Sequence, residues 1–389
     1  MMDNFDNDYF PASPDPYDFW ATKLGIEIRR KYYQGNVLGK TGAVLIGVMD
    51  WLLPETSRRL FNVGSLKYPI VIGQIILQLD LENRLSETTA EEALQQISSI
   101  STYDAGINGK AWGLGFAWMS KNGLYPSTLP FITHTPYIME ALIVLSKKSA
   151  IQQQALKIFE QTWPFLEGLK VMFRQNDTLA LSYAPVEEPR IVINANAYAA
   201  YSYALHAVYG RKEIRKKAIR KAEHIIRFIS RHLRDDGSWY YYADNDGGNF
   251  IDCFHSCFVI KNLLKTQKLL PELEDVVVPL TEKGWRFIRR SFYDQSAGLC
   301  RRFIERDIKD PFKWDLYDQA EYLGLLIDFN LRSEAKKFAE RTEERFKKGN
   351  SWYCRIDIMG RRWGRNFLRW GIVPFQYQKC RLISKTGSG

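Results

Sequence analysis

One short pattern decides the fold of this chain, because it recurs at the start of apolar helical runs: Thr133-His134-Thr135-Pro136-Tyr137, Asn194-Ala195-Asn196-Ala197-Tyr198, Asp252-Cys253-Phe254-His255-Ser256 and Asp315-Leu316-Tyr317-Asp318-Gln319. Each stretch is polar and flanked by aromatic residues. The interval is about 60 residues, longer than most solenoid repeats. Helix starts repeated in this way predict a ring of helical hairpins whose openings gather at one mouth.

The helical runs are of two types. Ala195–Ala207 contains no charged residue, which is typical of a helix buried on all sides, whereas Lys212–Leu233 carries charges on one face. We therefore expect an all-α toroid of roughly five or six hairpins, with inner helices wrapped by outer ones and short β-ribbons in the loops. The expected pairs are His134–Leu145 with Ala150–Leu166, Ala195–Tyr209 with Lys212–Leu233, Cys253–Thr266 with Leu273–Ser291, and Tyr317–Leu331 with Ser333–Phe346. Further helices are expected at Tyr17–Tyr33, Gly42–Leu52, Tyr68–Leu81, Ala90–Ser98 and Phe367–Leu382.

Domain organisation follows from the absence of any Gly/Ser-rich linker or sharp change of composition in the 389 residues. We expect one toroid domain over residues 17–382. Residues 1–16 are rich in Asp, Asn and Pro and are expected to be poorly ordered. Residues 383–389 are expected to form a flexible tail.

The formal net charge of +10 favours an anionic partner. Candidates are an acidic glycan, a phosphorylated lipid carrier, a membrane surface and nucleic acid. The densest basic run, Arg211–Lys221, is interpreted as the solvated face of an outer helix. No nucleic-acid-binding module is present, so nucleic acid is not expected as a partner.

The five cysteines are an odd number, and the N-terminus lacks the basic start and apolar core of a signal peptide. No stretch reaches the roughly 18 apolar residues of a membrane span. We therefore expect free thiols and a reducing, cytoplasmic compartment. Peripheral contact with the inner membrane face or with glycosyltransferase machinery stays open.

Asp252 and His255 are the first candidate catalytic pair. Three residues apart on a helix, they lie on neighbouring positions of one face, and a carboxylate beside an imidazole fixes the orientation of the ring. Such a histidine is suited to remove a proton from carbon or oxygen. The alternative is that Asp252 is only a helix N-cap and His255 a satisfied buried group.

Asp315, Asp318 and Glu321 form a second cluster around Tyr317. Two carboxylates across a cavity are the acid and base of a glycosidase, and Asp315 is equally a plausible N-cap. The other candidate site residues are polar or aromatic side chains at the expected mouth, with arginines suited to a carboxylate or phosphate. They are His134 and Tyr198 for catalysis, and Trp112, Trp118, Tyr137, Asn194, Asn196, Trp239, Tyr317, Arg365, Arg369 and Trp370 for substrate.

Several of these segments resemble the VpsJ-like polysaccharide biosynthesis proteins, which are similar to α/α toroids acting on uronate-containing glycans. The resemblance covers roughly residues 100–382 and rests on short motifs. They are the segments 111–118, 133–142, 192–197, 236–239, 249–255 and 369–371, which read AWGLGFAW, THTPYIMEAL, VINANA, DGSW, NFIDCFH and RWG.

This resemblance implies modification of an acidic surface polysaccharide or its lipid-linked precursor. The favoured chemistry is proton abstraction beside a uronate carboxylate, as in an epimerase or lyase, with His255, His134 or a tyrosine as base and Arg369 neutralising the carboxylate. Neither a metal nor a nucleotide cofactor is needed. The alternatives are hydrolysis by Asp252 with Asp315 or Asp318, and a non-catalytic glycan-binding partner of a polymerase or export complex.

Overall fold

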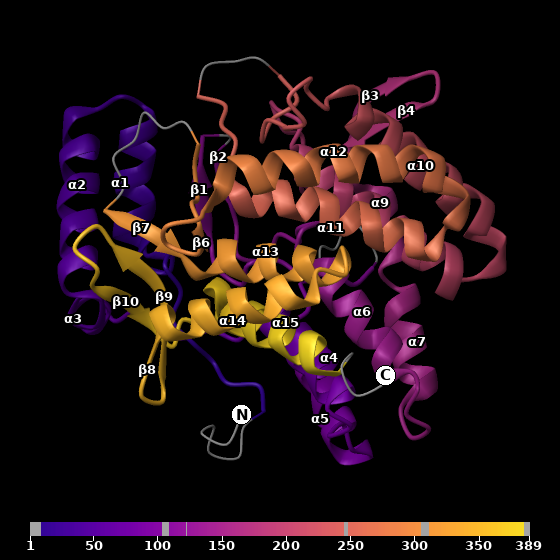
Figure 1. The fold of residues 1–389 in the computed structure, drawn as a ribbon, viewed down its shortest axis with the longest axis horizontal. Coiled ribbons are helices and arrows are strands. Elements are labelled where there is room, and N and C mark those ends of the chain that lie inside the picture. Colours follow the sequence, from indigo (N-terminus) through magenta and orange to yellow (C-terminus); the bar gives the residue numbers. More distant parts are fainter. Residues whose placement is uncertain (1–8, 103–108, 122, 245–247, 305–310, 385–389) are drawn as a thin grey trace.

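The computed structural model describes residues 9–102, 109–121, 123–244, 248–304 and 311–384. Its inner helices form a ring in which each helix packs against the next and the last returns to the first. In ring order they are α4 (Pro69–Leu81), α6 (Thr135–Leu145), α9 (Ile193–Tyr209), α11 (Cys253–Leu269), α13 (Leu316–Asp328) and α15 (Val373–Ser384). The predicted all-α toroid is therefore confirmed (Figure 1).

The outer helices cover this ring and bury only one face each. They are α5 (Glu87–Ser99), α7 (Gln152–Glu160), α8 (Trp163–Gly168), α10 (Arg215–Arg231), α12 (Glu274–Phe292) and α14 (Arg332–Phe346). In α10, Ala218, Ala222 and Ile225 are fully buried, whereas most charged residues of the basic run are exposed. In α9, by contrast, nearly every residue is buried. The predicted distinction between inner and outer helices is confirmed.

Short β-ribbons lie in the loops. The antiparallel pairs are β1 (Trp118–Ser120) with β2 (Gly123–Tyr125), β3 (Val171–Gln175) with β4 (Thr178–Leu181), and β5 (Tyr293–Asp294) with β6 (Leu299–Cys300). A larger sheet has the order β10 (Arg362–Arg365), β9 (Ser351–Asp357) and β7 (Phe312–Asp315), with β8 (Lys347–Lys348) also paired to β9. The register places Asp315 opposite Arg355.

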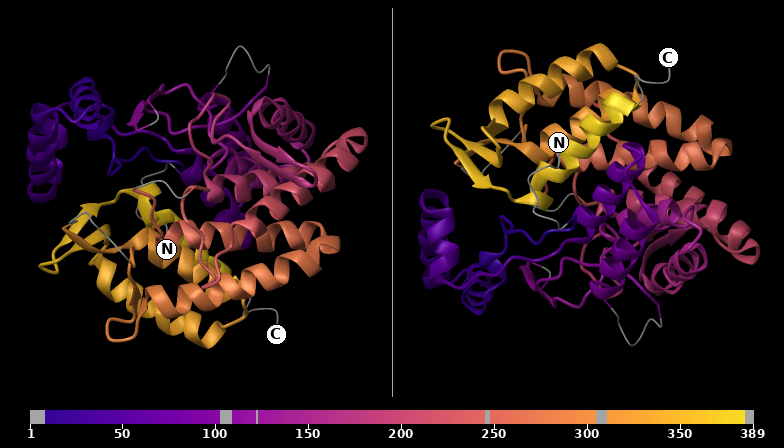
Figure 2. Two further views of the ribbon diagram at one scale, coloured as in Figure 1. Left: turned by 90° about the horizontal axis from the view of Figure 1, so that it is seen from above. Right: turned by 90° about the horizontal axis from the view of Figure 1, so that it is seen from below.

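A helical hairpin precedes the ring: α1 (Lys23–Tyr33), α2 (Val37–Leu52) and the short α3 (Pro54–Leu60). All three ribbon views show it at one edge of the molecule, outside the ring (Figures 1 and 2). Its position beside the larger sheet is fixed by two indole groups: Trp51 Nε1 donates to Asp357 at 3.0 Å, and Trp363 Nε1 donates to the Asp50 carbonyl at 2.9 Å.

The N-terminal segment differs from its prediction. Phe10 and Asp15 are fully buried, and Ser13 pairs with Leu66 through the backbone. Poor order is therefore the wrong expectation for residues 9–16, because this segment fills space between the hairpin and the ring. Residues 1–8 and 385–389 lie outside the described part, so the rest of that prediction and most of the predicted tail stay untested.

The prediction of free thiols is confirmed, since all five cysteines are buried and free, whereas the expected compartment stays a prediction. In the described residues no single helix is long and apolar enough to cross a membrane. Helices α2 and α3 reach that length and composition only when taken together, and the chain bends by 119° between them.

Candidate active site

The mouth of the ring is where the inner helices begin. Asp252 and Asp315 occupy the N-cap positions of α11 and α13, and His134 precedes α6. The start of α15 reaches the same place through a kink at Gly371, whose φ is +93°. A Cβ atom at Gly371 would lie 2.5 Å from the backbone nitrogen of Tyr317. Glycine therefore permits the close approach that brings Trp370 beside Asp315.

Asp252 and His255 form the pair that the sequence predicts. His255 Nδ1 lies 2.8 and 2.9 Å from the two carboxylate oxygens of Asp252, whose side chain is 1% exposed. The Asp252 carboxylate makes no capping bond to its own helix. Because the acceptor fixes Nδ1 as the donor, Nε2 is the imidazole nitrogen left for another partner. The His255 side chain is 21% exposed.

His255 lines a small hollow that we call the histidine pocket. Its walls are Ile193, Asn194, Trp239, Tyr240, Tyr241, Asp252, His255, Ser256 and Val259. Its volume of about 10 Å³ is that of a single water site. The buried Oδ1 of Asn194 has no hydrogen-bond partner among the described residues. The pocket is therefore lined by an oriented imidazole and by an amide side chain whose oxygen lacks a partner among the described residues.

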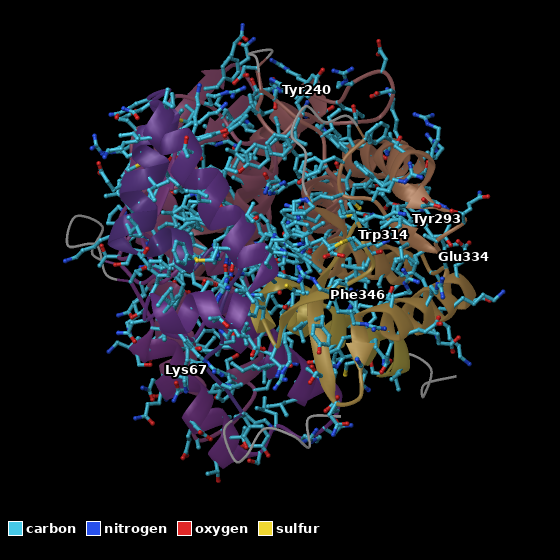
Figure 3. The ribbon with its side chains drawn as sticks, turned by 90° about the vertical axis from the view of Figure 1, so that its left-hand side faces the viewer. Lys67, Tyr240, Tyr293, Trp314, Glu334 and Phe346 are labelled. Atoms are coloured by element: carbon cyan, nitrogen blue, oxygen red, sulfur yellow. The ribbon has the colours of Figure 1, made fainter. Side chains whose placement is uncertain are left out.

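A larger hollow of about 190 Å³, which we call the cationic cleft, shares no lining residue with the histidine pocket. Its walls are Tyr17, Arg302, Phe303, Phe312, Lys313, Trp314, Asp315 and Arg355. Trp314 lies toward the middle of the molecule in Figure 3, whereas Glu334 is at the periphery. Three cationic side chains face one carboxylate in this wall, so the cleft favours an anionic group.

Asp315 holds the cleft together. Its Oδ2 accepts from Arg355 Nε at 3.0 Å, from Arg302 Nη1 at 3.3 Å and from the Trp370 indole at 2.8 Å. Its Oδ1 accepts from the backbone of Tyr317, so Asp315 is also the N-cap that the sequence suggests. Charge-assisted bonds of this kind fix guanidinium planes in a defined orientation.

Arg302 joins the two hollows. Its Nη2 lies 4.0 Å from Asp252 Oδ2, and its guanidinium sits 4.4 Å from the centre of the Phe254 ring. Asp318 lies behind this group, fully buried, with Oδ1 accepting from the backbone of Phe254. Burial raises the pKa of the Asp318 carboxyl well above its ordinary value.

The predicted tyrosines lie deeper, on the inner surface of the ring. Tyr137 and Tyr198 share a hydrogen bond of 2.8 Å between their hydroxyls, and Lys261 Nζ lies 3.1 Å from the Tyr137 hydroxyl. Lys261 also pairs with Glu321 at 2.8 Å. Burial raises the pKa of both tyrosines well above the ordinary value. Tyr317 stacks on Phe254, nearer to the cleft.

Other predicted residues turn away from both hollows, which corrects their expected roles. The Trp112 ring is fully buried and its indole donates to the Ile97 carbonyl. The amide of Asn196 is used by the backbone of Leu181 and Val192. These side chains hold the chain in place, because each satisfies backbone groups that would otherwise be buried without a partner.

His134 and Arg369, the predicted base and carboxylate partner, are also internal. Burial lowers the pKa of His134 to about 3, so its imidazole is neutral over the physiological range. Arg369 Nε donates to Asp15 at 2.6 Å in the buried N-terminal segment, which supplies the carboxylate expected from a substrate. The expected role of Arg369 is therefore wrong in this arrangement.

Three remaining aromatic or basic residues have mixed positions. Arg365 is exposed on β10, outside the cleft. Trp118 carries the Arg29 guanidinium 3.8 Å from its ring centre and packs edge-on against Tyr17. Trp239 lines the histidine pocket, although its indole nitrogen donates to Ile229 inside the protein.

Sequence reasoning missed Tyr17, Arg302 and Arg355. Alternation along β9 would have placed Arg355 and Tyr353 on one face of a strand. Nothing local, however, indicates that this strand pairs with the segment ending at Asp315. Within the described residues no cluster of three or more metal-ligating side chains is present.

Comparison with known proteins bears on the fold. No family model and no curated protein sequence matches the chain. Solved structures match the chain at low sequence identity. Cellobiose 2-epimerase from Bacillus thermoamylovorans is 12% identical with a TM-score of 0.60, and the match covers 84% of this chain and 90% of the epimerase. D-Mannose isomerase is 14% identical with a TM-score of 0.59, and the match covers 82% of this chain and 86% of the isomerase. The GH76 α-mannanase from Bacteroides thetaiotaomicron shares 12% at 0.57, with the same coverages of 82% and 86%.

At these identities the likeness establishes the toroid fold, which is shared with sugar epimerases, sugar isomerases and a glycoside hydrolase. The fold alone does not select among such reactions. The VpsJ-like resemblance is not among these matches and stays a prediction.

Proposed function

We propose that this protein modifies an acidic sugar by moving a proton on a carbon beside the anionic group, as an epimerase or lyase does. The observation that carries the proposal is the juxtaposition of an oriented imidazole and a cationic cleft. His255 is bonded to Asp252, and Asp252 lies 4.0 Å from Arg302 of the cleft. Base and anion-binding groups thus belong to one cluster.

The chemistry needs two things that this cluster supplies. A base must take the proton, and Nε2 of His255 is the nitrogen that its Asp252 bond leaves available. Negative charge then develops on the sugar carboxylate, where fixed cationic donors stabilise it. Arg302 and Arg355 are held for this purpose by Asp315, at 3.3 and 3.0 Å.

An acidic glycan fits the cleft better than a neutral one. Lys313 adds a third cationic side chain to the wall, and the aromatic rings of Tyr17, Phe312 and Trp314 supply apolar surface. Carboxylate and phosphate groups match guanidinium geometry, and aromatic faces suit sugar rings. A lipid-linked precursor of a surface polysaccharide remains within this proposed class.

Glycoside hydrolysis is the less favoured reaction. It needs two carboxyl groups free to act on opposite sides of the bond. Asp315 is occupied by two arginines and an indole, and Asp318 is fully buried. Asp252 therefore has no partner carboxylate facing the same hollow among the candidates. A non-catalytic glycan binder is the remaining alternative and is separated by the experiment below.

The experiment is a substrate panel in heavy water. Oligomers of glucuronate, galacturonate and mannuronate are incubated with the protein beside the neutral sugars cellobiose and mannose. Solvent deuterium entering a uronate indicates epimerisation, and ultraviolet absorbance indicates elimination. His255→Gln is expected to reduce either signal about 100- to 10,000-fold, because it removes the base. His224→Gln, on the outer helix α10, is the matched control with unchanged activity.

Each other outcome contradicts a defined part of the proposal. New reducing ends without deuterium uptake would establish hydrolysis instead. Turnover of the neutral sugars alone would overturn the acidic substrate class. Binding of a uronate oligomer without any turnover would leave a glycan-binding protein.

A further inference from the structure

The outward face of α2 is apolar over its whole length. Val37, Leu38, Val44, Leu45, Val48 and Leu52 are 44–74% exposed. At 100° per residue they fall within one arc of the helix, and Thr41 is the only polar residue between them. Half of the large apolar side chains exposed in the described residues lie between residues 24 and 60. Scattered single residues of this kind are ordinary, but a contiguous patch marks an interaction surface.

The inward face of α2 explains why the large residues point outward. Gly39 and Gly42 face α1, where a Cβ at Gly39 would lie 2.3 Å from the backbone nitrogen of Tyr32. Small residues thus allow the two helices to pack closely. The bulky aliphatic side chains occupy the opposite side, where no described residue covers them.

A second exposed apolar segment adjoins the end of this helix. Ile358 and Met359, in the turn between β9 and β10, are each 66% exposed. This turn is fixed to α2 because Arg361 Nη1 donates to the Leu52 carbonyl at 3.4 Å and Trp51 donates to Asp357. Two segments about 300 residues apart therefore present aliphatic groups at one corner, next to the exposed Leu53.

The charge near the exposed apolar face of α2, which we call the apolar stripe, indicates what kind of partner covers it. Residues 23–60 contain seven Lys or Arg and three Asp or Glu. The exposed charged side chains among them are Lys23, Arg30, Lys40 and Arg59, against one exposed acid, Glu55. An apolar helix face on a hairpin with an excess of exposed cations is typical of a helix that lies in the interface of an anionic membrane.

We propose that α2 lies along the surface of an anionic lipid bilayer, with its apolar stripe in the boundary between headgroups and acyl chains. The helix has 16 residues, fewer than the roughly 20 that span the hydrocarbon core. The bend of 119° before α3 also favours lying on the membrane over crossing it. This mode of attachment is independent of the reaction at the cleft.

Vesicle sedimentation tests the proposal. The full chain is mixed with vesicles of phosphatidylcholine alone and with vesicles that also contain phosphatidylglycerol. It is expected to pellet with the second kind only. The triple variant Val44→Glu, Leu45→Glu and Val48→Glu is expected to lose about tenfold or more in partitioning. These positions are exposed, so the circular dichroism spectrum and melting temperature should not change.

The matched control carries three exposed apolar positions at the opposite end of the molecule. Leu156→Glu, Val171→Glu and Val208→Glu have starting exposures of 36–52% and add the same charge. This control is expected to pellet like the parent chain. Equal pelleting of both triple variants, or no pelleting of the parent with anionic vesicles, would overturn the proposal. A dimer in light scattering that only the α2 variant dissociates would assign the stripe to a second copy.

Discussion

Two halves of the toroid mouth are built from the same kinds of residue and behave differently. At the start of α6, His134 is buried, and at the start of α9 the side-chain amide of Asn196 forms hydrogen bonds with the backbone. At the starts of α11 and α13, Asp252 binds a side chain, His255, and Asp315 binds two arginines that line a cleft. Openings of the same polar and aromatic character therefore serve stability on one side and ligand chemistry on the other. What separates them is whether the polar atoms bond to the backbone or to side chains that face a hollow.

The largest effect on stability is expected at Asp315, which holds the two arginines of the cleft in place. Asp315→Asn removes the carboxylate charge that Arg302 and Arg355 share in the largely buried wall of the cleft. Weakening both ion pairs at once is predicted to cost about 3 kcal/mol. Chemical denaturation measures this loss. Asp177→Asn is the control, because Asp177 also pairs with two arginines, Arg227 and Arg231, but at the surface. Its cost should stay within about 1 kcal/mol. Equal costs would show that Asp315 is not buried as described.

Asn196 and Asn194, two residues apart, allow a structural role to be compared with a binding role. Asn196→Ala leaves the N–H and C=O of Leu181 unsatisfied in the interior and should destabilise the fold by about 2 kcal/mol. Asn194→Ala removes an oxygen that already lacks a partner. Its cost in unfolding free energy should be smaller than that of Asn196→Ala, while affinity for a uronate ligand falls. The reverse ranking in thermal melts would contradict the division of the mouth.

The sealed histidine predicts a pH dependence of stability. The folded-state pKa of His134 is lowered to about 3 from 6.5, chiefly by burial. Below pH 6.5 the unfolded chain therefore binds a proton that the folded chain does not bind. The free energy of unfolding falls as the pH is lowered from about 6.5 to about 3. Between pH 7 and pH 5 this histidine should contribute about 2 kcal/mol to the fall. His134→Gln should flatten the curve by that amount. An unaltered slope in His134→Gln would place that imidazole in contact with water.

The smallest effect is expected at Arg365, which the sequence assigns to substrate binding and the structure places on an exposed strand. Arg365→Ala should change the unfolding free energy by less than about 0.5 kcal/mol. It should leave the affinity for a uronate unchanged. Arg355→Ala, from the adjacent strand, should reduce that affinity at least about tenfold. Calorimetric titration of both variants compares them, and a loss at Arg365 would extend the site beyond the cleft.

Much of the fold was predictable because helical periodicity and burial are local signals. The charge-free run at 195–207 and the basic run beyond it marked α9 and α10 to within a few residues. Errors arose at caps. The first helix begins at Lys23 because Thr22 accepts from the backbone of Gly25, not at Tyr17 as expected. The expected helix over 150–166 is divided before Trp163, where a proline takes the second helical position.

The candidate site was predictable only where its contacts are close in sequence. Asp252 and His255 are three residues apart, so helix geometry alone brought them together. The partners of Asp315 come from a loop 13 residues before it and from a strand 40 residues after it. Asp15 reaches Arg369 across 354 residues. Such pairings depend on how the ring closes, and a single sequence carries no local sign of them.

A crystal structure with a bound glucuronate- or galacturonate-containing oligosaccharide tests the central claim most directly. The account predicts the sugar carboxylate within about 3 Å of the guanidinium groups of Arg302 and Arg355, with the neighbouring ring carbon facing His255. A sugar seated against the start of α6, or one whose carboxylate avoids both arginines, would contradict it.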